Sequence, residues 1–367
     1  MSIQEQRLLI GDRYYDKTNL EELLKLSLPM AKELYSFMKE WMSDDRYVRV
    51  QTSGSTGTPK QLRVEKSRMM ESARRTCSFL QLSKGDAALL CLPLAYIAGK
   101  MMVVRALVGQ LRLVLVTPSG SPLEGIDEPI DFAAMIPLQV YNALQDSVNC
   151  ERLQQIKQLI IGGGAIDAVL EEQLYLFPRA VWSTYGMTET LSHIALRRLN
   201  GDEATAFYRP MKDVTLLQAA DGSLIIDAPA IVKQRLFTND LVLLNEDQSF
   251  QILGRKDTVI NTGGVKVQME LVEQKLQQLL CMPFQVTAVQ HPKFGELVVL
   301  LLRASLSQKQ MDELSKISSA VLTRYECPKR LYEVDALPIT ENGKPDRLAA
   351  KKLATILFQS EEEQQSN

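Results

Sequence analysis

Histidine is nearly absent from this sequence of 367 residues, which holds only His193 and His291. A Ser-His-Asp hydrolase would need one of the two as its general base, and a histidine-ligated metal site would need both. His291 lies in the segment QHPKFGE, which is typical of a loop. If the chain is an enzyme, we therefore expect its chemistry to proceed without a histidine base.

Cysteine is also sparse, and its distribution excludes the common cysteine frameworks. The number of cysteines is odd, and no two of them form a C-x-x-C pair. A disulfide scaffold or a zinc site is therefore not expected. We predict free, buried thiols at all five positions, which are Cys77, Cys91, Cys150, Cys281 and Cys327.

Neither sign of charge is in excess. Lysine and arginine together number 42 and aspartate and glutamate 44, so the formal net charge is −2. A protein that binds the phosphate backbone of nucleic acid carries a basic stripe, and a peripheral membrane anchor carries a polybasic segment. We therefore expect neither nucleic acid nor a membrane surface as a partner.

Long apolar runs are lacking as well. Runs such as LVVLLL at 297–302 are far shorter than the stretch of about 20 residues that spans a bilayer. The N-terminal segment MSIQEQRLLIGDRYYDK does not have the basic-then-apolar pattern of a secretory signal. We expect no membrane insertion and a cytoplasmic location.

What the chain does contain is ordinary for a globular protein, with 46% hydrophobic and 23% charged residues. Its length predicts two or three domains. Up to about residue 220, short apolar segments alternate with helical patterns such as 66–80. The predicted strands are ALLCLP at 88–93, RLVLVTP at 112–118, KQLII at 157–161 and AVWSTYG at 180–186. This alternation favours an α/β fold with mostly parallel sheets and crossover helices.

The pattern changes after residue 220. SLIID, LVLLN and FQILG predict short strands of a small β unit. The polar GRKD at 254–257 then precedes a compact α+β segment, with helices near 269–280 and 309–323 and a last helix that starts at Pro345. Strands are expected near 285–290, 296–303 and 330–336. We predict a large N-terminal α/β domain at 1–254, a hinge at 255–257 and a small C-terminal α+β domain at 258–367.

The stretch TSGSTGTPK at 52–60 concentrates glycines and hydroxyls and ends on a cation. Glycine lets backbone N–H groups approach a ligand closely, hydroxyls add donors, and Lys60 adds a positive charge. These groups together suit a triphosphate. The stretch is not a Walker A loop, because Gly54 and Gly57 are too close together and Pro59 precedes Lys60. Taken alone, it is equally compatible with a flexible surface loop.

TSGSTGTPK resembles the phosphate loop of the adenylate-forming superfamily, which comprises acyl-CoA synthetases, adenylation domains and luciferases. Three further segments resemble motifs of the same family in the same order: STYGMTET at 183–190, GRKDTVINTGG at 254–264 and LPITENGKPDR at 337–347. GGGA at 162–165 resembles the loop that packs against adenine. The resemblance covers about residues 50–350 and implies a large N-terminal domain followed by a small, mobile C-terminal domain.

The reaction that the resemblance implies has two steps. A carboxylate and ATP form an acyl-AMP and pyrophosphate, and a thiol then attacks the acyl-AMP. The implied cofactors are ATP, Mg²⁺ and CoA. A carboxylate is ionised at pH 7 and needs no general base, which agrees with the scarcity of histidine. Catalysis should rest on positioning and positive charge, because one anion must approach another.

By this resemblance Lys344 lies beside the α-phosphate and the substrate carboxylate, where a flexible ammonium can follow the moving charge. Thr188 donates to the α-phosphate, Glu189 binds Mg²⁺, and Tyr185 stacks on adenine. Without the motif, these would be a solvated lysine, a first-turn carboxylate and a core aromatic. The remaining predicted nucleotide contacts are Thr52, Ser53, Gly54, Ser55, Thr56, Gly57, Lys60, Gly163, Gly164, Ala165, Gly186 and Met187.

Asp240, in FTNDL, matches the acid of the family's Thr-Gly-Asp motif that grips the ribose hydroxyls, although Asn239 replaces the glycine. Arg255 is expected to contact the ribose or a phosphate, with a surface salt bridge as the alternative. Asp257 stands at the family's hinge position. Rotation there would present either Lys344 or the Gly263–Gly264 loop, where a pantetheine arm of CoA could approach; a plain turn is the alternative for the two glycines.

The identity of the acid is indicated by two segments. LPLAYIAGKMM at 92–102 resembles the family segment Leu-Pro-Leu-Phe-His-x-x-Gly, with Tyr96 in place of the histidine. YGMTETLSHIALRR most resembles o-succinylbenzoate–CoA ligases of menaquinone synthesis, whose substrate is a dicarboxylate. A second carboxylate needs a polar or cationic partner, and the acid-pocket candidates are Tyr96, Lys100, Arg105, Ser192 and His193.

The phosphate loop begins at residue 52, earlier than is usual in the family. We therefore expect a shortened N-terminal subdomain, which leaves its substrate contacts open and also whether the protein forms a homodimer. Two alternative functions remain. The chain is either a ligase or carrier-protein-loading enzyme for another aryl or acyl acid, or a non-catalytic nucleotide-binding protein.

Overall fold

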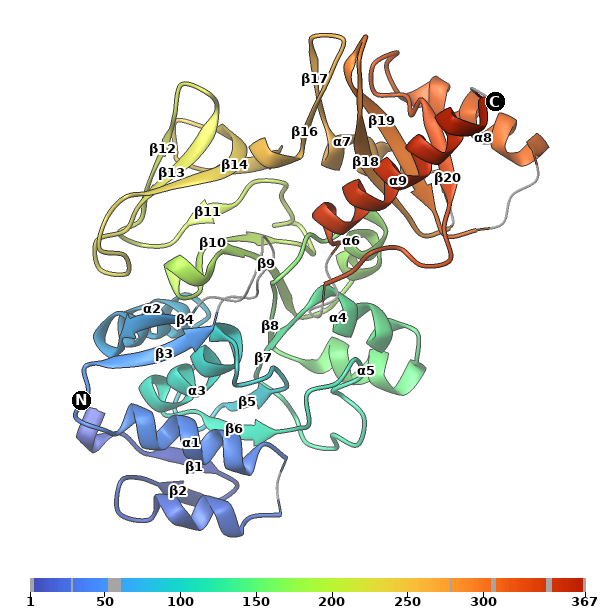
Figure 1. The fold of residues 1–367 in the computed structure, drawn as a ribbon. Coiled ribbons are helices and arrows are strands. Elements are labelled where there is room, and N and C mark those ends of the chain that lie inside the picture. The colour runs from blue at the N-terminus through green and yellow to red at the C-terminus, as the bar shows by residue number, and fades with distance from the viewer. Residues whose placement is uncertain are drawn as a thin grey trace.

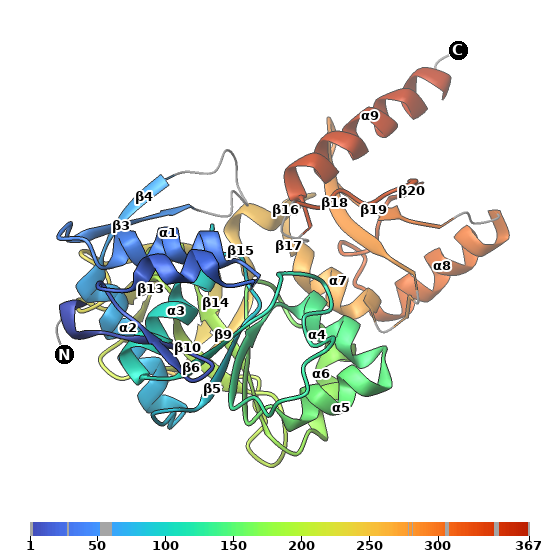
Figure 2. The same ribbon diagram turned by 90° about the horizontal axis from the view of Figure 1, so that it is seen from below.

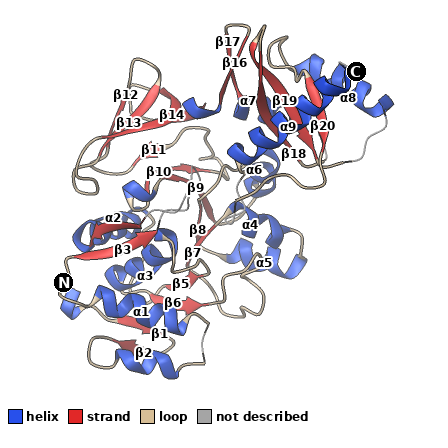
Figure 3. Ribbon diagram, in the orientation of Figure 1, coloured by secondary structure: helices blue, strands red, loops and turns tan. Residues whose placement is uncertain are grey.

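The computed structural model describes residues 3–27, 29–51, 61–277, 279–280, 282–304, 308–340 and 345–365 (Figure 1). Helices and strands alternate along the first half of the chain, and strands dominate the middle (Figure 3). The expected α/β class is confirmed, because a large, mostly parallel sheet precedes separate small antiparallel sheets.

The large sheet has nine strands in the order β11-β10-β9-β8-β7-β5-β6-β1-β2. Its parallel strands are β1 (Leu8–Ile10), β5 (Ala87–Leu90), β6 (Arg112–Leu115), β7 (Phe132–Met135), β8 (Gln158–Ile161) and β9 (Ala180–Gly186). Antiparallel strands complete the two edges, namely β2 (Arg13–Tyr15), β10 (His193–Arg198) and β11 (Arg209–Pro210). The sequence-predicted strands at 157–161 and 180–186 are confirmed almost to the residue. β8 is a largely buried apolar run, as is typical of a strand covered on both faces, whereas buried residues alternate with less buried ones along β9.

Helices cover both faces of this sheet (Figures 1 and 2). α2 (Lys66–Phe79) and α3 (Ile97–Gly109) lie on one face, and α4 (Pro137–Leu144), α5 (Ser147–Gln155) and α6 (Ala168–Tyr175) lie on the other. α1 (Ala31–Trp41) packs against the 3-10 helix η2 (Leu20–Lys25), and a second short 3-10 turn is η1 (Ile3–Glu5). α3 is apolar around almost its whole circumference, because it packs against both α2 and the sheet.

A two-stranded hairpin of β3 (Tyr47–Gln51) and β4 (Gln61–Glu65) stands beside α2. The connection between the two strands is the segment 52–60, which lies outside the described residues. Gln51 forms a parallel bridge with Tyr96, the residue before α3. The base of the predicted phosphate loop is therefore fixed next to the beginning of α3.

A four-stranded antiparallel sheet follows, which is the small β unit expected after residue 220. Its strands are β12 (Thr215–Gln218), β13 (Ser223–Asp227), β14 (Leu236–Leu244) and β15 (Phe250–Arg255). Asp240 on β14 stands directly opposite Arg255 on β15. This register brings together two residues that are 15 positions apart in the sequence.

The C-terminal segment forms a five-stranded sheet with three helices. The strands are β16 (Val259–Thr262), β17 (Val265–Gln268), β18 (Phe284–His291), β19 (Gly295–Leu302) and β20 (Arg330–Glu333). The helices are α7 (Met269–Gln277), α8 (Gln308–Val321) and α9 (Arg347–Gln365), and η4 (Lys256–Thr258) leads into this segment. α9 begins two residues later than expected, because Pro345 bridges to Ile339 and the Asp346 side chain caps the helix at Ala349 N.

The buried apolar residues fall into separate clusters. The largest cluster draws on residues from Leu8 to Phe250, and two smaller ones draw on residues from Ile260 to Phe358. The elements of the smaller clusters lie to one side of the rest in both ribbon views (Figures 1 and 2). Within the described part of the chain, helices of the length and apolar character needed to cross a membrane are not found.

The four cysteines among the described residues carry free thiols. Cys77 and Cys91 are buried, as expected, whereas Cys150 and Cys327 are only half-buried. Cys281 lies outside the described residues.

Candidate functional site

Three of the predicted motif segments follow the carboxyl ends of parallel strands, at one edge of the large sheet. β5, β7, β8 and β9 run in the same direction and are neighbours. The segment with Tyr96 follows β5, the glycine-rich 162–165 follows β8, and the 186–190 turn follows β9. Ligands of open α/β sheets bind at such an edge, so the topology places these motifs where a nucleotide could reach them together.

The glycine-rich segment after β8 requires glycine at positions 162 and 163. A side-chain carbon on Gly162 would lie 2.3 Å from Thr184 Oγ1 on the neighbouring strand β9. Gly163 has φ +82°, which side chains rarely adopt. Gly163, Gly164 and Ala165 are exposed at the sheet edge. Their backbone is therefore accessible to a flat ligand, and their contact with adenine stays a prediction.

Tyr185, at the end of β9, is joined to Asp240 of the small β unit. Its hydroxyl donates to Asp240 Oδ2 at 2.5 Å, and each of the two residues is only 7% exposed. Burial raises the pKa of Tyr185, and the Asp240 carboxylate raises it further, so the phenol stays protonated and donates. The ring packs edge-on against Phe250, with 5.1 Å between centroids. The Tyr185 ring is therefore part of the hydrophobic core. Its stacking on adenine stays a prediction.

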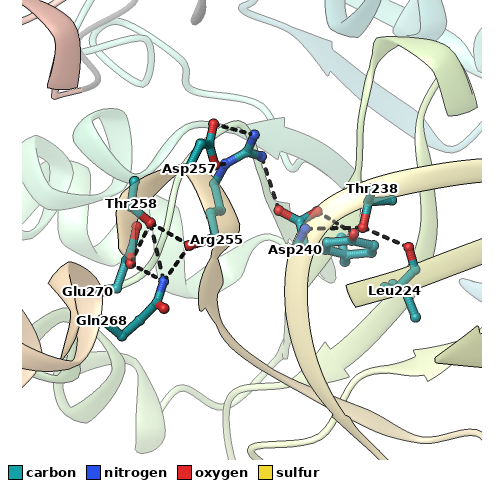
Figure 4. A network of polar contacts seen from close by, with 9 residues as sticks. Leu224, Thr238, Asp240, Arg255, Asp257, Thr258, Gln268 and Glu270 are labelled. Carbon is teal, nitrogen blue, oxygen red and sulfur yellow. Dashed lines mark hydrogen bonds and ion pairs between the residues drawn. The ribbon is translucent and has the colours of Figure 1, made fainter. Parts of the chain in front are cut away.

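The Asp240 carboxylate is held from several sides (Figure 4). Oδ1 accepts a hydrogen bond from Arg255 Nη1 at 3.0 Å, and the Asp240 backbone N–H donates to Thr238 Oγ1 at 3.1 Å. Thr238 in turn donates to the Leu224 carbonyl at 2.8 Å. Asn239 points to solvent, because side chains alternate along β14. Replacement of the family's glycine by Asn239 therefore leaves the acid in place.

Arg255 connects Asp240 to the predicted hinge residue Asp257. Its Nε and Nη2 donate to the two oxygens of Asp257 at 2.9 and 3.1 Å, while Nη1 remains on Asp240 (Figure 4). The hydrogen bonds that Arg255 donates to Asp257 raise the pKa of Arg255, although burial opposes the shift. This bidentate arrangement is the strong geometry of an arginine–carboxylate pair.

Gln268 and Glu270 close the same network from the C-terminal side, and sequence reasoning missed both. Gln268 Nε2 donates to the Arg255 carbonyl at 2.7 Å and to Glu270 Oε2 at 2.8 Å, and Thr258 Oγ1 donates to Glu270 Oε2 at 2.9 Å (Figure 4). A side-chain carbon on Gly254 would lie 2.1 Å from the Gln268 amide. Only the glycine could have indicated this contact, since the motif itself does not include Gln268.

The turn after β9 is strained. Leu191 has φ +65° and ψ −34°, and Ser192 N donates to the Thr190 carbonyl at 2.7 Å, which is the pattern of a γ-turn. The Thr190 hydroxyl accepts from Met187 N at 2.9 Å and bonds the Ser192 carbonyl at 2.7 Å. These bonds leave Thr188 half-buried and Glu189 exposed. Such strain is typical of functional turns.

Glu189 has the chemistry expected of a Mg²⁺ ligand. It is an exposed carboxylate on this turn, and Mg²⁺ in nucleotide sites is bound by one or two carboxylates together with substrate phosphates. Within the described ranges, no group of three His, Cys, Asp or Glu side chains is placed to hold a metal ion. A single carboxylate is enough for a Mg²⁺ ion that is bound mainly by the phosphates of the nucleotide.

We expect Gly186→Ala to destroy nucleotide-dependent stabilisation of the protein. The added carbon would lie 2.3 Å from the Ser192 carbonyl oxygen, which is backbone and cannot rotate away. The turn that carries Thr188 and Glu189 would have to shift. The measurement is the change in the thermal unfolding midpoint on addition of Mg²⁺-ATP.

Gly11→Ala is the matched control for Gly186→Ala. Gly11 has φ +56°, but nothing lies within 4 Å of the added carbon. Gly11→Ala should lower the free energy of unfolding by about 1 kcal/mol, because alanine is strained at this φ. It should leave the stabilisation by ATP intact. An unchanged response to ATP in Gly186→Ala would contradict the assignment of this turn.

The structure brings three of the five acid-pocket candidates together and separates the other two. Arg105 Nη2 donates to Ser192 Oγ, and Ser192 Oγ lies 3.3 Å from His193 Nδ1. Lys100 instead donates to the Arg49 carbonyl of the hairpin and lies over the Phe37 ring.

Burial lowers the pKa of Lys100, whose ammonium is occupied by the hairpin. Tyr96 is half-buried beside Gln51. Among the described residues, neither Lys100 nor Tyr96 forms a hydrogen bond with Arg105, Ser192 or His193. Their predicted place in an acid pocket stays a prediction.

Gly263 and Gly264 form the two-residue turn between β16 and β17. Their φ angles of +59° and +81° are those of the type I′ hairpin turn, which favours glycine at both positions. Nothing lies within 4 Å of a side-chain carbon built on Gly264. The conformation of this hairpin turn therefore accounts for both glycines. The outer side of the turn is open, so a ligand such as CoA could approach it.

The remaining predicted residues lie outside the described part of the chain. These are the phosphate-loop residues Thr52, Ser53, Gly54, Ser55, Thr56, Gly57 and Lys60, together with Lys344. Their roles stay predictions.

The sequence is similar to a family of known enzymes. The model of the AMP-binding enzyme family matches residues 13–216, which is more than half of the chain. A 2-succinylbenzoate–CoA ligase of a Geobacillus species is 22% identical over 94% of this chain and 76% of its own length. A D-alanine–D-alanyl carrier protein ligase of Lacticaseibacillus paracasei is also 22% identical, over 90% of this chain and 74% of its own length.

Solved structures have the same fold. The crystal structure of an acyl-CoA synthetase (AMP-forming)/AMP-acid ligase II-like protein from Dyadobacter fermentans is 32% identical, with a TM-score of 0.62 over 91% of this chain and 97% of that one. An o-succinylbenzoate–coenzyme A synthetase from Bacillus subtilis, solved with ATP and magnesium, is 20% identical with a TM-score of 0.70, and covers 86% of this chain and 76% of that one.

Proposed function

The chain belongs to the AMP-binding enzyme family and is an AMP-forming acid–thiol ligase, and we propose that its acid is o-succinylbenzoate and its thiol that of CoA. The observation that supports nucleotide binding most directly is the Tyr185–Asp240–Arg255 network at the sheet edge where β9 ends, in which Tyr185 and Asp240 are buried and Arg255 is half-exposed. Similarity to 2-succinylbenzoate–CoA ligases supports the choice of acid.

Asp240 suits the ribose hydroxyls of ATP. Each of its oxygens already accepts one hydrogen bond, from Tyr185 or from Arg255, and a carboxylate oxygen can accept a second. The two protein donors fix the carboxylate before the nucleotide arrives. A pre-organised acceptor binds with little further loss of conformational entropy.

In the first step a carboxylate oxygen of the acid attacks the α-phosphorus of ATP, and pyrophosphate leaves with the bond pair. Bound Mg²⁺ supplies neutralisation of phosphate charge, and Glu189 would hold it. Thr188 and Lys344 would stabilise the charge that develops on the α-phosphate. The step needs no base, and the buried His193 could not act as a strong one, because burial lowers its pKa well below the ordinary value.

In the second step the CoA sulfur attacks the acyl carbon, AMP leaves, and the thiol proton is released to solvent. We propose that the segment 258–367 rotates at 255–257 between the two steps relative to the segment 1–254. The separate apolar cores before Phe250 and after Ile260 support such a division. The Arg255–Asp240 and Gln268–Arg255 contacts would break and re-form in this motion, since they connect the hinge to the segments on its two sides.

Gly264→Leu is expected to lower the rate of thiolysis by at least about tenfold while pyrophosphate release continues. The side chain has space in this structure but would cover the turn that a pantetheine arm must approach. Its φ of +81° also adds about 1–2 kcal/mol of strain. The measurement compares CoA-dependent thioester formation from supplied acyl-AMP with acid-dependent pyrophosphate release.

Gly222→Leu is the control for Gly264→Leu, because Gly222 has φ +86° in a hairpin of the other small sheet. It should be similarly destabilising but affect neither half-reaction selectively. Thiolysis at the wild-type rate in Gly264→Leu would show that the pantetheine arm does not approach along this turn.

Pyrophosphate release with ATP, Mg²⁺ and a panel of carboxylic acids, with and without CoA, tests the proposed function. Selective release with o-succinylbenzoate and completion to a thioester would support it. Similarity to D-alanine–D-alanyl carrier protein ligases makes loading of a carrier protein the second candidate. Release with another acid and transfer to a carrier protein would favour that candidate, and silence across the panel would favour a non-catalytic nucleotide-binding protein.

A further inference from the structure

Arg105 is a buried arginine without a carboxylate partner. It lies on α3 and is 2% exposed. Nη2 donates to Ser192 Oγ, Nη1 approaches the weak acceptor Met102 Sδ at 3.5 Å, and buried Nε has no hydrogen-bond partner. Among the described residues, no Asp or Glu forms an ion pair with it.

Other shielded arginines of this chain are paired, which makes Arg105 unusual. Arg197 pairs with Glu171 at 2.6 Å, and Arg75 pairs with Glu71 at 3.0 Å. An unpaired buried charge costs several kcal/mol. Burial lowers the pKa of Arg105 only to about 10, so the guanidinium is still charged at neutral pH. Its positive charge is therefore uncompensated by the protein around it.

The groups around Arg105 are neutral. His193 Nε2 lies 3.1 Å from Thr76 Oγ1, and burial with the nearby Arg105 charge keeps the pKa of His193 low, so its ring is uncharged. Cys77 donates weakly to the Arg105 carbonyl, and burial raises the pKa of its thiol to about 11. The cluster of Arg105, Ser192 and His193 thus carries one net positive charge.

This cluster adjoins the turn that follows β9. The Ser192 carbonyl accepts a hydrogen bond from the Thr190 hydroxyl and lies 2.3 Å from the position that a side-chain carbon on Gly186 would take. Arg105 therefore reaches, through Ser192, the same turn that presents Thr188 and Glu189. An acid whose reacting carboxylate lies at Thr188 could extend its far end toward α3 and the guanidinium.

We propose that Arg105 and Ser192 bind a second carboxylate at the far end of the acid substrate, and that Arg105 selects for diacids. The inference rests on the proposed function, because it concerns the acid of that reaction. A carboxylate would receive charge-assisted bonds from the guanidinium and from the Ser192 hydroxyl. Lys100 takes no part, since its ammonium is bound to the hairpin.

The test compares Arg105→Met and Arg105→Lys with the wild type on three acids. These are o-succinylbenzoate, 4-oxo-4-phenylbutanoate, which lacks the ring carboxylate, and 2-butanoylbenzoate, which lacks the aliphatic one. The two readouts are kcat/KM for pyrophosphate release and the affinity of each acid by calorimetry. For Arg105→Met we expect a 10- to 100-fold loss with the diacid and less than about threefold loss with whichever monoacid the wild type uses.

Arg105→Lys should retain part of the preference for the diacid, because it keeps a charge without the planar fork. Arg75→Met is the matched control: it removes a shielded arginine from the neighbouring helix α2, but one that is paired. It should lower the unfolding midpoint and leave the ratio of diacid to monoacid activity unchanged. Arg105→Met should leave the midpoint unchanged or raise it.

Equal losses with the diacid and the monoacid in Arg105→Met would overturn the proposal and make Arg105 a structural residue. Wild-type activity with a monoacid, together with no binding of o-succinylbenzoate, would overturn it too. Binding of o-succinylbenzoate that depends on Arg105 but yields no pyrophosphate would support the inference and contradict the proposed function. The two failures are therefore distinguishable.

Discussion

Replacement of Lys344 by alanine is expected to slow formation of the acyl-adenylate by about a thousandfold and to leave thiolysis of supplied acyl-AMP nearly unchanged. Two anions must meet in the first step, so one well-placed cation has its greatest value there. The second step requires no approach of a carboxylate to a phosphate. The loss should therefore appear in one half-reaction only.

Described residues on both sides of the segment 341–344 are anchored by hydrogen bonds and ion pairs. Ile339 and Pro345 form a bridge, and Asp346 N donates to the Pro338 carbonyl at 3.0 Å. Arg347 at the start of α9 is bound to Glu273 and so ties the helix to α7. Lys344 itself lies outside the described residues, directly before this anchored point.

The measurement for Lys344→Ala is ATP–pyrophosphate exchange beside CoA-dependent turnover of synthetic acyl-AMP. Lys293→Ala is the control, since Lys293 lies in an exposed turn of the same C-terminal segment. It should leave both half-reactions unchanged. Equal loss in both half-reactions of Lys344→Ala would refute the catalytic role.

Asp240→Ala is expected to weaken ATP binding by about a hundredfold and to destabilise the protein by about 2–4 kcal/mol. The substitution removes the proposed acceptor for the ribose hydroxyls. It also leaves the buried Tyr185 hydroxyl without its carboxylate acceptor and Arg255 with Asp257 alone. We expect both losses from one substitution, because the Asp240 carboxylate bonds Tyr185 in the proposed nucleotide site and Arg255 in the proposed hinge.

Calorimetric titration with ATP and denaturant unfolding measure the two effects of Asp240→Ala. Asp227→Ala is the matched control, because Asp227 lies on the same small sheet and pairs with the exposed Arg235. An exposed pair contributes at most about 1 kcal/mol. Normal ATP affinity in a folded Asp240→Ala protein would exclude Asp240 from the nucleotide site.

Local pattern determined the elements of this fold. Short strand-like segments between turn residues predicted β8 and β9 closely, and Gly163 and Gly264, which belong to the predicted motifs, have φ angles above +50°. The helical period could also have separated Lys100 from Arg105, because five residues turn a helix by about 140°. Periodicity alone, however, does not tell which of the two faces the interior.

The amino-acid sequence by itself determined the fold class and the family, because strand and helix patterns and short motifs depend on neighbours along the chain. Only the tertiary structure decided the partners. Asp240, Arg255 and Asp257 meet because β14 and β15 pair in one register, and Gln268 joins them across a turn of the chain. In the sequence Arg105 was one of two cationic candidates, with Lys100, and only the packing shows that it is buried without an acidic partner. Pairing of charges depends on distance in space, which no local pattern encodes.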